Sequence, residues 1–329
     1  MERSLERAVS LLSILNARDD YTLSLDNMAE RLGCTADQVS CLVENIRLFD
    51  DLLKIKDDVI TLTRRLDLLD SGLLYHKSLG RGRSFVIDVV DSTNLEFVRN
   101  KDNAVNGDFL VAEIQTKGRG RYDHVWHTSI GSDLTLSGAF SFKKIKDTFG
   151  LSLVAAVTIC RVLESYGLEV ALKWPNDVYV KGHKISGILI ESVPRRKDIL
   201  AIIGIGLNVY SKSYKDDKIN ATALDAFLQS KGYELKDASG RILNRTEIAA
   251  DLINKLKKYV KRFEEEGMPF FLKVYKKHDY LLSRHISIKS GDMILQGRAC
   301  GLSTKGYLLL KDENAQIVEV KSGHILQID

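Results

Sequence analysis

The chain has 329 residues, of which 44% are hydrophobic and 28% charged, and its formal net charge is +4. This length suggests two or three domains with ample core, and the composition excludes a disordered or fibrous chain. The mild positive charge permits acidic ligands but does not by itself indicate nucleic-acid binding.

The cysteines and the N-terminus indicate the compartment. Four cysteines are scattered along the chain without a CxxC pair, at Cys34, Cys41, Cys160 and Cys300. A disulfide framework or a zinc site is therefore not expected, and reduced thiols fit better. The N-terminal MERSLERAVS has no apolar signal core, and the longest apolar run, residues 199–207, is too short to span a bilayer. We expect a cytoplasmic protein without membrane contact.

Residues 1–65 have the pattern of a winged helix-turn-helix. Apolar residues recur at helical spacing over residues 4–17, and residues 24–33 predict a short helix with a capping serine and a terminal glycine. A second helix is predicted over residues 35–47, followed by two short strands on either side of Asp57 and Asp58.

Such a unit can bind DNA through side chains of its second helix in the major groove. The candidate contacts in that helix are Gln38, Ser40, Asn45 and Arg47. The alternative is a winged helix used for protein contacts or regulation, because the helix also carries Asp37 and Glu44 and the turn of the wing is acidic. DNA affinity depends largely on neutralising phosphates, which these carboxylates oppose.

A connecting segment follows over residues 66–84, with helix expected as far as Leu74. Residues 84–90 then predict a buried strand, and residues 91–94 (DSTN) begin a short helix over LEFVRN. Asp, Ser and Thr at a helix start usually only accept hydrogen bonds from free N–H groups. That is the simpler interpretation of Ser92 and Thr93.

Two glycines alternate with two arginines shortly after residues 109–112, an apolar run that predicts a strand. They are Gly118, Arg119, Gly120 and Arg121. Glycine lets backbone N–H groups approach an anion closely, and arginine offers a fork of donors that matches phosphate or carboxylate. Such a loop can close over an anionic ligand, although a solvated basic loop is the commoner explanation of GRGR alone. The similar sequence at residues 80–83 is interpreted as a linker or turn.

The middle of the chain predicts further sheet and one long helix. Residues 133–142 alternate as in a half-buried strand, and residues 151–166 form an apolar helix that ends at Gly167. Residues 170–173 predict a strand that delivers KWPND to its end, where proline forces a turn from which Asn176 and Asp177 project. A hairpin follows, with strands at 177–180 and 184–191 and a turn at residues 182–183, and then an apolar strand at 199–209.

Helices are expected at residues 219–230, 245–266 and 269–282, with the charges of the second forming a solvated face. Residues 285–329 predict short strands in a small all-β barrel, with Lys305 exposed in a turn. GxxxxGK[ST], HExxH and GxSxG are absent, and the seven histidines are dispersed. A P-loop, a zinc protease site and a serine hydrolase site are therefore not expected.

Five motifs together closely resemble the biotin protein ligases, in particular the bifunctional ligase/repressor form. In chain order they are DSTN (91–94), GRGR (118–121), KWPND (173–177), KISGILIE (184–191) and GIGLN (204–208). The resemblance covers nearly the whole chain. It implies an α+β fold with a winged helix-turn-helix over 1–65, a class II synthetase-like mixed sheet with helices over 66–282, and an SH3-like β-barrel over 283–329.

The resemblance also implies roles for individual residues. Biotin would contact Ser92, Thr93, Asn94, Gln115, Gly118, Arg119, Gly120, Arg121, Lys184 and Gly187. ATP and the adenylate would contact Arg121, Trp126, Asn176, Lys184 and Asn208. The catalytic candidates are Lys184, Arg119, Arg121 and Asp177, and Asp177 would position Mg²⁺ or help an attacking lysine to lose its proton. Taken singly, Lys184 is also consistent with a surface lysine and Trp126 with a core aromatic.

The implied activity is ATP-dependent biotin attachment. Biotin and Mg-ATP would form biotinyl-5′-AMP, and biotin would then pass to a lysine of the biotin carboxyl carrier protein of acetyl-CoA carboxylase. The adenylate-bound form would be a homodimer that binds operator DNA and represses biotin synthesis genes. A lipoate ligase on the same scaffold, and a biotin-sensing transcription regulator with weak or no ligase activity, stay open as alternatives.

The chain departs from the family pattern after the glycine–arginine motif. Relatives usually continue GRGR-x-G-R, whereas this sequence reads Tyr122, Asp123, His124. Aspartate tolerates unusual backbone angles, so the loop can still close. It adds a negative charge near the phosphates, however, and a mostly neutral histidine replaces an arginine. We therefore expect the closed loop to hold the adenylate less tightly than in relatives.

Overall fold

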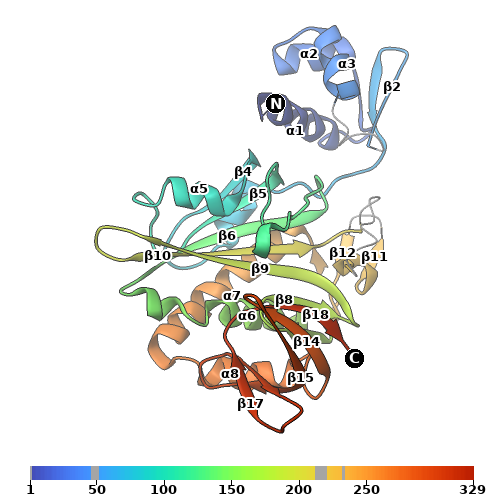
Figure 1. Ribbon diagram of the computed structural model, residues 1–329. Coiled ribbons are helices and arrows are strands. Elements are labelled where there is room, and N and C mark those ends of the chain that lie inside the picture. The colour runs from blue at the N-terminus through green and yellow to red at the C-terminus, as the bar shows by residue number, and fades with distance from the viewer. Residues whose placement is uncertain (1, 46–51, 212–220, 232–233) are drawn as a thin grey trace.

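The computed structural model describes residues 2–45, 52–211, 221–231 and 234–329. Figure 1 shows an N-terminal unit, a large central sheet with helices, and a C-terminal β unit on the far side of that sheet. The central and C-terminal parts form a mixed α+β fold. One segment, Ile145–Ser165, is long and apolar enough to cross a membrane by length and composition, but 67% of its apolar 18-residue window is buried inside the protein, as in the core helix of a globular fold.

The N-terminal unit combines three helices with a small antiparallel sheet. Its elements are α1 (Glu2–Asn16), β1 (Thr22–Ser24), α2 (Leu25–Leu32), α3 (Ala36–Asn45), β2 (Leu53–Lys56) and β3 (Val59–Leu62), with strand order β1-β3-β2. The Ser24 hydroxyl accepts a hydrogen bond from the N–H of Asn27, and Gly33 ends α2 in the left-handed conformation. The predicted caps are thus confirmed. Arg47 lies outside the described residues.

The central sheet has seven strands in the order β4-β5-β6-β10-β9-β8-β7. The strands are β4 (Ser84–Val90), β5 (Asp108–Gln115), β6 (Asp133–Phe142), β7 (Val170–Lys173), β8 (Asp177–Val180), β9 (His183–Pro194) and β10 (Ile199–Asn208). β4 pairs with β5 in parallel, and the other neighbours are antiparallel.

Two predictions of burial were wrong because a strand's place in the sheet cannot be seen locally. β4 is an edge strand, and of its residues only Val89 and Val90 are buried. β6 lies inside the sheet between β5 and β10, so both of its faces are buried and not just one. The turn of the β8–β9 hairpin also lies one residue earlier than predicted, at Lys181 and Gly182, both with positive φ.

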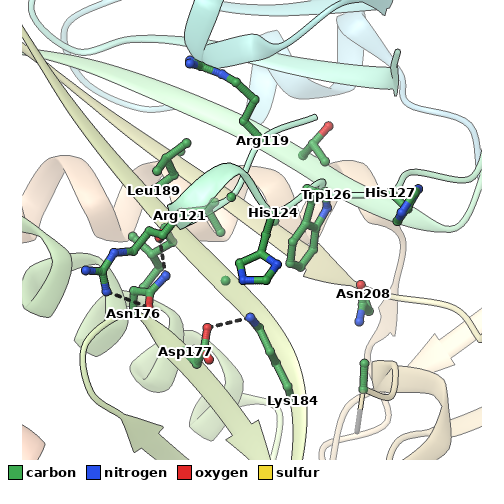
Figure 2. A pocket seen from close by; sticks show the side chains of 18 of the residues that line it. Arg119, Arg121, His124, Trp126, His127, Asn176, Asp177, Lys184, Leu189 and Asn208 are labelled. Carbon is green, nitrogen blue, oxygen red and sulfur yellow. Dashed lines mark hydrogen bonds and ion pairs between the residues drawn. The ribbon is translucent and has the colours of Figure 1, made fainter. Parts of the chain in front are cut away.

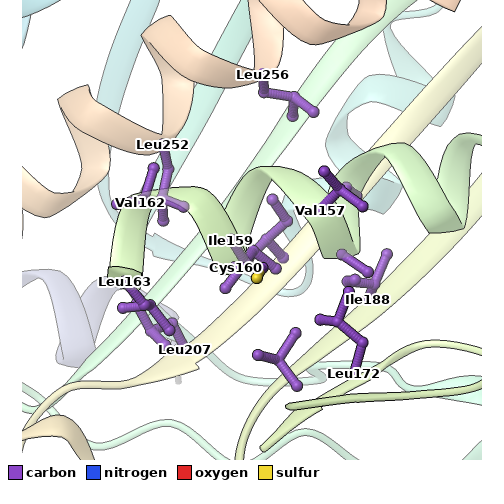
Figure 3. Close-up of a cluster of buried hydrophobic side chains, with 14 of the residues drawn as sticks. Val157, Ile159, Cys160, Val162, Leu163, Leu172, Ile188, Leu207, Leu252 and Leu256 are labelled. Carbon is purple, nitrogen blue, oxygen red and sulfur yellow. The ribbon is translucent and has the colours of Figure 1, made fainter. Parts of the chain in front are cut away.

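Helices cover the two faces of this sheet unequally. α6 (Leu151–Ser165) and α7 (Arg245–Glu266) pack on one face over the main apolar core, where side chains from α6 such as Ile159 and Leu163 meet Leu252 of α7 and Leu207 of β10 (Figure 3). The short α5 (Thr93–Arg99) covers part of the other face, over a smaller cluster that includes Phe97 and Leu200. The rest of that second face is left open for a pocket.

The region between β10 and α7 differs from prediction. The expected helix over residues 219–230 is wrong: the described part holds a 3-10 turn (Leu224–Ala226) and the strands β11 (Gln229–Lys231), β12 (Glu234–Lys236) and β13 (Ile242–Leu243). The cause is backbone pairing with distant segments. The N–H of Thr222 donates to the carbonyl of Lys184, and Ala221 forms a β-bridge with the same lysine.

The last helix is shorter than predicted. α8 (Pro269–His278) stops four residues early because the N–H of Tyr280 donates to the carbonyl of Leu172 and so extends the sheet edge at β7. α4 (Ser71–Lys77) forms in the connecting segment, slightly later than expected. It begins at Asp70, whose side chain accepts a hydrogen bond from the N–H of Leu73.

The C-terminal unit is a five-stranded antiparallel sheet in the order β17-β16-β15-β14-β18. Its strands are β14 (His285–Ser290), β15 (Met293–Leu302), β16 (Leu308–Lys311), β17 (Ile317–Val320) and β18 (His324–Ile328). The Trp174 indole N–H donates to the carbonyl of Gly306 at 3.2 Å, which fixes this unit to the KWPND corner. The C-terminal unit therefore stands at the rim of the open sheet face.

Candidate active site

A pocket of about 1000 Å³ opens on the sheet face that α6 and α7 leave uncovered (Figure 2). Its volume lies at the upper end of the range for small-molecule sites. Residues from β5, β9, β10, the start of α5, the KWPND corner, the glycine–arginine loop and β18 line it. Motifs that are far apart in the sequence therefore meet in one cavity.

Glycines on adjacent strands form part of the floor and make room for other groups. Gly187 of β9 pairs in register with Gly206 of β10. A Cβ atom on Gly206 would lie 2.3 Å from the indole of Trp126, and one on Gly204 would lie 2.4 Å from the side chain of Asn94. A side chain at either position would displace a pocket residue. These glycines therefore leave space in the pocket for Trp126 and Asn94. The sequence motif GIG did not reveal this role by itself.

The glycine–arginine loop is a narrow hairpin. The N–H of Gly120 donates to the carbonyl of His124, and the N–H of Trp126 donates to the carbonyl of Gly118. Gly118 does not line the pocket; an added Cβ there would meet the Trp126 carbonyl at 2.2 Å, so its role in this structure is to let the two arms of the hairpin approach. The residue in the left-handed conformation is Tyr122, at φ 55°, one position before Asp123.

Trp126 is a wall residue of the pocket and not a core aromatic. It is only partly buried, and its ring lies over the glycines of β9 and β10. Gly120 and Arg121 line the same pocket from the other end of the hairpin. The loop therefore carries an aromatic face and a cation into the cavity together, as Figure 2 shows.

Hydrogen bonds join the start of α5 to β5 and β6. The Gln115 side-chain oxygen accepts hydrogen bonds from the N–H and the hydroxyl of Thr93, at 2.8 and 3.1 Å. The Ser137 hydroxyl donates to the side-chain amide oxygen of Asn94 at 2.5 Å. Ser92 occupies the cap position of α5 but makes no capping hydrogen bond through its side chain. Because Ser92, Thr93 and Asn94 are buried and line the pocket, simple helix capping does not account for them.

Lys184 and Arg121 both line the pocket and have different partners. The Lys184 ammonium lies 2.7 Å from the Asp177 carboxylate, and both side chains remain partly exposed in the pocket (Figure 2). The Arg121 guanidinium reaches Asn176, at 3.5 Å, and lies over the ring of Tyr122. An anionic ligand can therefore approach Lys184 and Arg121 together.

Arg119 is placed differently from Arg121. Its guanidinium forms an ion pair with Glu191 of β9 at 2.6 Å, and Figure 2 shows it pointing away from Lys184. Its charge is therefore already balanced at the edge of the pocket. The sequence could not reveal this pairing, because Glu191 is 72 positions away from Arg119.

The two predicted asparagines are fixed to the backbone. The side-chain amide of Asn176 donates to the carbonyl of Ile188, and that of Asn208 donates to the carbonyl of Thr222. Both residues line the pocket. Each is therefore held with one end bound, which orients the other end.

The pocket residues that were not proposed from the sequence include three titratable side chains, those of Lys173, His124 and His324. Burial lowers the pKa of the Lys173 ammonium, which also donates to the hydroxyl of Tyr179. Burial also lowers the pKa of His324, and the nearby ring of His124 lowers it further. The only available signals were that Lys173 opens the KWPND motif and that His124 departs from the family pattern.

Asp177 is the single acidic side chain among the described residues that line the pocket. A hard carboxylate oxygen suits Mg²⁺, which usually takes one or two carboxylates and completes its shell with phosphate and water. The donor set of the pocket thus fits a Mg²⁺ ion held at Asp177. The DNA-binding candidates Gln38, Ser40 and Asn45 belong to the separate N-terminal unit.

Two regions of the chain match family models. Residues 86–208 match the biotin/lipoate A/B protein ligase family, and residues 282–326 match the biotin protein ligase C-terminal domain. The bifunctional ligase/repressor BirA of Salmonella typhimurium is 31% identical over 309 residues, covering 93% of this chain and 92% of that protein. The protein of the same name from Bacillus subtilis is 24% identical, covering 96% and 97%.

A solved structure has the same fold over most of its length. The biotin protein ligase from Aquifex aeolicus, in complex with biotin and ATP, is similar with a TM-score of 0.60 and 28% sequence identity. The match covers 74% of this chain and 97% of that one.

Proposed function

This chain belongs to the biotin protein ligase family, and we infer that it attaches biotin to a carrier protein in a reaction driven by ATP. One observation carries the inference most directly. The family motifs meet in one pocket that presents Lys184, Arg121 and Asp177 beside a glycine floor and a tryptophan wall. This arrangement suits a ligand with an apolar ring system, a carboxylate and phosphates.

The first reaction is the formation of biotinyl-5′-AMP. The biotin carboxylate oxygen attacks the α-phosphorus of ATP, a new phosphorus–oxygen bond forms, and pyrophosphate leaves. We propose that Lys184 and Arg121 neutralise the two anions as they approach, while Ser92, Thr93 and Gln115 hold the polar ring of biotin. Trp126 would lie against the adenine, and Asn176 and Asn208 would contact the nucleotide. When bound, Mg²⁺ held by Asp177 would supply further positive charge to the phosphates.

The second reaction is transfer to the carrier. The ε-amine of a carrier lysine attacks the mixed anhydride, an amide bond forms, and AMP leaves. We propose that Asp177 helps this amine to lose its proton, and that the loop over residues 118–126 keeps water from the anhydride. The proposed acceptor is the biotin carboxyl carrier protein of acetyl-CoA carboxylase, and we propose that the reaction takes place in the cytoplasm.

We propose that the N-terminal unit is a winged helix-turn-helix that binds operator DNA when the chain is a homodimer with bound adenylate. The tight turn at Gly33 between α2 and α3, and the β2–β3 hairpin, support this assignment. A groove between α1 and α3 is lined by Arg3, Arg7 and Gln38, which adds positive charge beside the second helix. The side-chain oxygen of Gln38 already accepts a hydrogen bond from the N–H of Thr35, at the start of α3.

The C-terminal unit is proposed to be an SH3-like barrel that helps to close the active site. Gly323, His324 and Ile325, at and just before the start of β18, line the pocket beside the loop, where the ring of His324 lies 5.9 Å from that of His124. The C-terminal unit would then contribute residues to the active site.

The deciding experiment is biotin transfer. The purified chain is mixed with biotin, Mg-ATP and a carrier domain, and the mass of the carrier is followed. We expect an ATP-dependent gain that disappears in Lys184→Ala and is not competed by lipoate. Tight biotin binding and an operator shift without any gain would instead identify a sensor without ligase activity, and transfer of lipoate would identify the other branch of the family.

Repression is tested separately by the mobility of operator DNA with and without biotin and ATP. We expect the shift to require both ligands and to weaken in Arg7→Ala, since α1 borders the proposed DNA face. A shift that ignores the ligands would contradict the proposed ligand-dependent repressor.

A further inference from the structure

The segment that joins the N-terminal unit to the central sheet is held on both sides. On the N-terminal side, the Asn16 side chain at the end of α1 both accepts from the N–H of Leu66, at 2.7 Å, and donates to its carbonyl, at 2.9 Å. Leu66 also belongs to an apolar cluster that contains residues of α1 and α2 together with Val89 of β4 and Ile114 of β5. The position of α1 is therefore tied to the backbone of this connector.

On the other side, the connector is bound to the core of the central unit through Asp67. One Asp67 carboxylate oxygen accepts the N–H of Arg245, at 2.7 Å, and the hydroxyl of Tyr210, at 3.0 Å. The Arg245 guanidinium is fully buried and donates to the carbonyl of Asp67 and to the carboxylate of Glu113. Buried polar groups that satisfy one another in this way hold a segment rigidly.

Tyr210 connects this arrangement to the pocket. It lies two residues after Asn208, the nucleotide-site candidate at the end of β10, and itself lines the pocket. Its N–H donates to the carbonyl of Ser132, so the ring is fixed at its base while its hydroxyl reaches Asp67. A continuous chain of contacts thus runs from the pocket wall through Tyr210, Asp67 and Leu66 to Asn16 of α1.

We propose, resting on the function proposed above, that Asp67 couples occupation of the pocket to the position of the N-terminal unit. A nucleotide or adenylate beside Asn208 restricts the motion of Tyr210, which strengthens the hydrogen bond from its hydroxyl to Asp67. The connector in turn restricts the motion of α1 through the hydrogen bonds of Asn16. The coupling is an ordering effect and needs no large movement. It is also reciprocal, so a partner that fixes the N-terminal unit tightens ligand binding by the same factor.

Hydrogen exchange of the full chain tests this coupling without DNA. Exchange is measured by mass spectrometry in peptides from α1 and from residues 66–74, with and without biotin and Mg-ATP, while pyrophosphate release reports adenylate formation. In the unaltered chain we expect the ligands to slow exchange about tenfold in both peptides. In Asp67→Ala, adenylate formation persists but neither peptide responds; in Asn16→Ala, the 66–74 peptide responds and α1 does not.

A matched control lies in the same connector. Asp70 is exposed and caps α4 without touching Tyr210 or Arg245, so Asp70→Ala keeps the ligand response in both peptides. If Asp67→Ala fails to fold, which its melting temperature will show, the exchange of the two peptides in Asn16→Ala decides whether the coupling exists. Adenylate formation without any response at residues 66–74 overturns the coupling, as does an unchanged response in Asn16→Ala. A response without biotin transfer supports the coupling and overturns the ligase function, and the absence of both overturns both.

Discussion

The guanidinium of Arg119 and the carboxylate of Glu191 form an ion pair 2.6 Å long across the open face of the central sheet. The same carboxylate oxygen accepts a hydrogen bond from the side-chain N–H of Asn94, at 2.8 Å. Glu191 therefore fastens the glycine–arginine loop to the start of α5, two segments that both line the pocket. The loop is held at its first arginine, while Arg121 stays available to a ligand.

Glu191→Gln is expected to weaken biotin binding while the protein stays folded. The amide keeps the shape of the side chain but loses the charge that holds Arg119, and both side chains are partly exposed, so the effect is modest. We expect the KM for biotin to rise about fivefold with little change in the melting temperature. Steady-state kinetics with saturating ATP measures the change, and an unaltered KM would show that the loop does not need this anchor.

Gly206→Ala tests the glycine floor. The added Cβ would lie 2.3 Å from the Trp126 ring, so the indole must move into the space where a ligand sits. We expect the affinity for biotin alone to fall at least about tenfold. With two tryptophans in the chain, intrinsic fluorescence follows both binding and the movement of Trp126.

The matched control for this variant is the double change Gly206→Ala with Trp126→Ala, which removes the clash. It should regain part of the lost biotin affinity. Wild-type biotin affinity in Gly206→Ala alone would mean that the pocket has more room above Gly206 than the contact with Trp126 indicates.

Much of the fold and of the site could be predicted because the signals are local or lie in one motif. The capping Ser24 and the terminal Gly33 mark the ends of α2, and the structure has both. KWPND and the following KISGILIE place Asp177 and Lys184 on paired strands, where they form an ion pair. Short-range patterns of this kind depend on neighbouring residues alone.

The rest depended on contacts between distant segments. Arg245 opens a charged helix and was expected among solvated charges, yet it is fully buried against Glu113. The residues after 219 were predicted to be helical, but Thr222 pairs with Lys184 instead. Glu191 lies in a recognised motif, but no role could be assigned to it before its ion pair with Arg119 was known. In each case the deciding partner lies tens of residues away, where no periodicity reports it.

The double change Asp123→Gly with His124→Arg tests whether this chain's departure from the family pattern loosens the closed loop. It removes a negative charge and adds a positive one where the phosphates are expected. We expect biotinyl-5′-AMP to dissociate about tenfold more slowly. Release of labelled adenylate after a chase measures the rate, with His124→Arg alone separating the two charges; an unchanged rate would contradict the hypothesis.

The cysteines should differ sharply in reactivity. Burial raises the pKa of the Cys160 thiol to about 12, and the residue lies in the main core under α7. Cys41 and Cys300 are exposed. Because the thiolate is the reactive species, Cys160 stays protonated and unreactive across the physiological range, and a thiol reagent at pH 8 labels it only after unfolding. Rapid native labelling at Cys160, located by peptide mass, would contradict its place in the core.

Arg245→Met is expected to be the most destabilising of these changes. The methionine fills a similar volume, but Glu113 and Asp67 keep buried carboxylates without their cation, and burial already raises the pKa of Asp67 despite the neighbouring guanidinium. Removing one partner of a buried pair usually costs about 3–5 kcal/mol. We expect a loss of that size in the free energy of unfolding, measured by urea denaturation.

The double variant Arg245→Met with Glu113→Gln decides the cause of that loss. If the cost is the buried charge left behind, neutralising Glu113 recovers part of the stability, and the two effects are not additive. If the cost is lost packing at the start of α7, the double variant is at least as unstable as the single one. Because Glu113 also accepts the N–H of Leu69 and of Gly131, recovery will be partial even in the first case. The sign of the coupling energy, and not its size, therefore separates the two explanations.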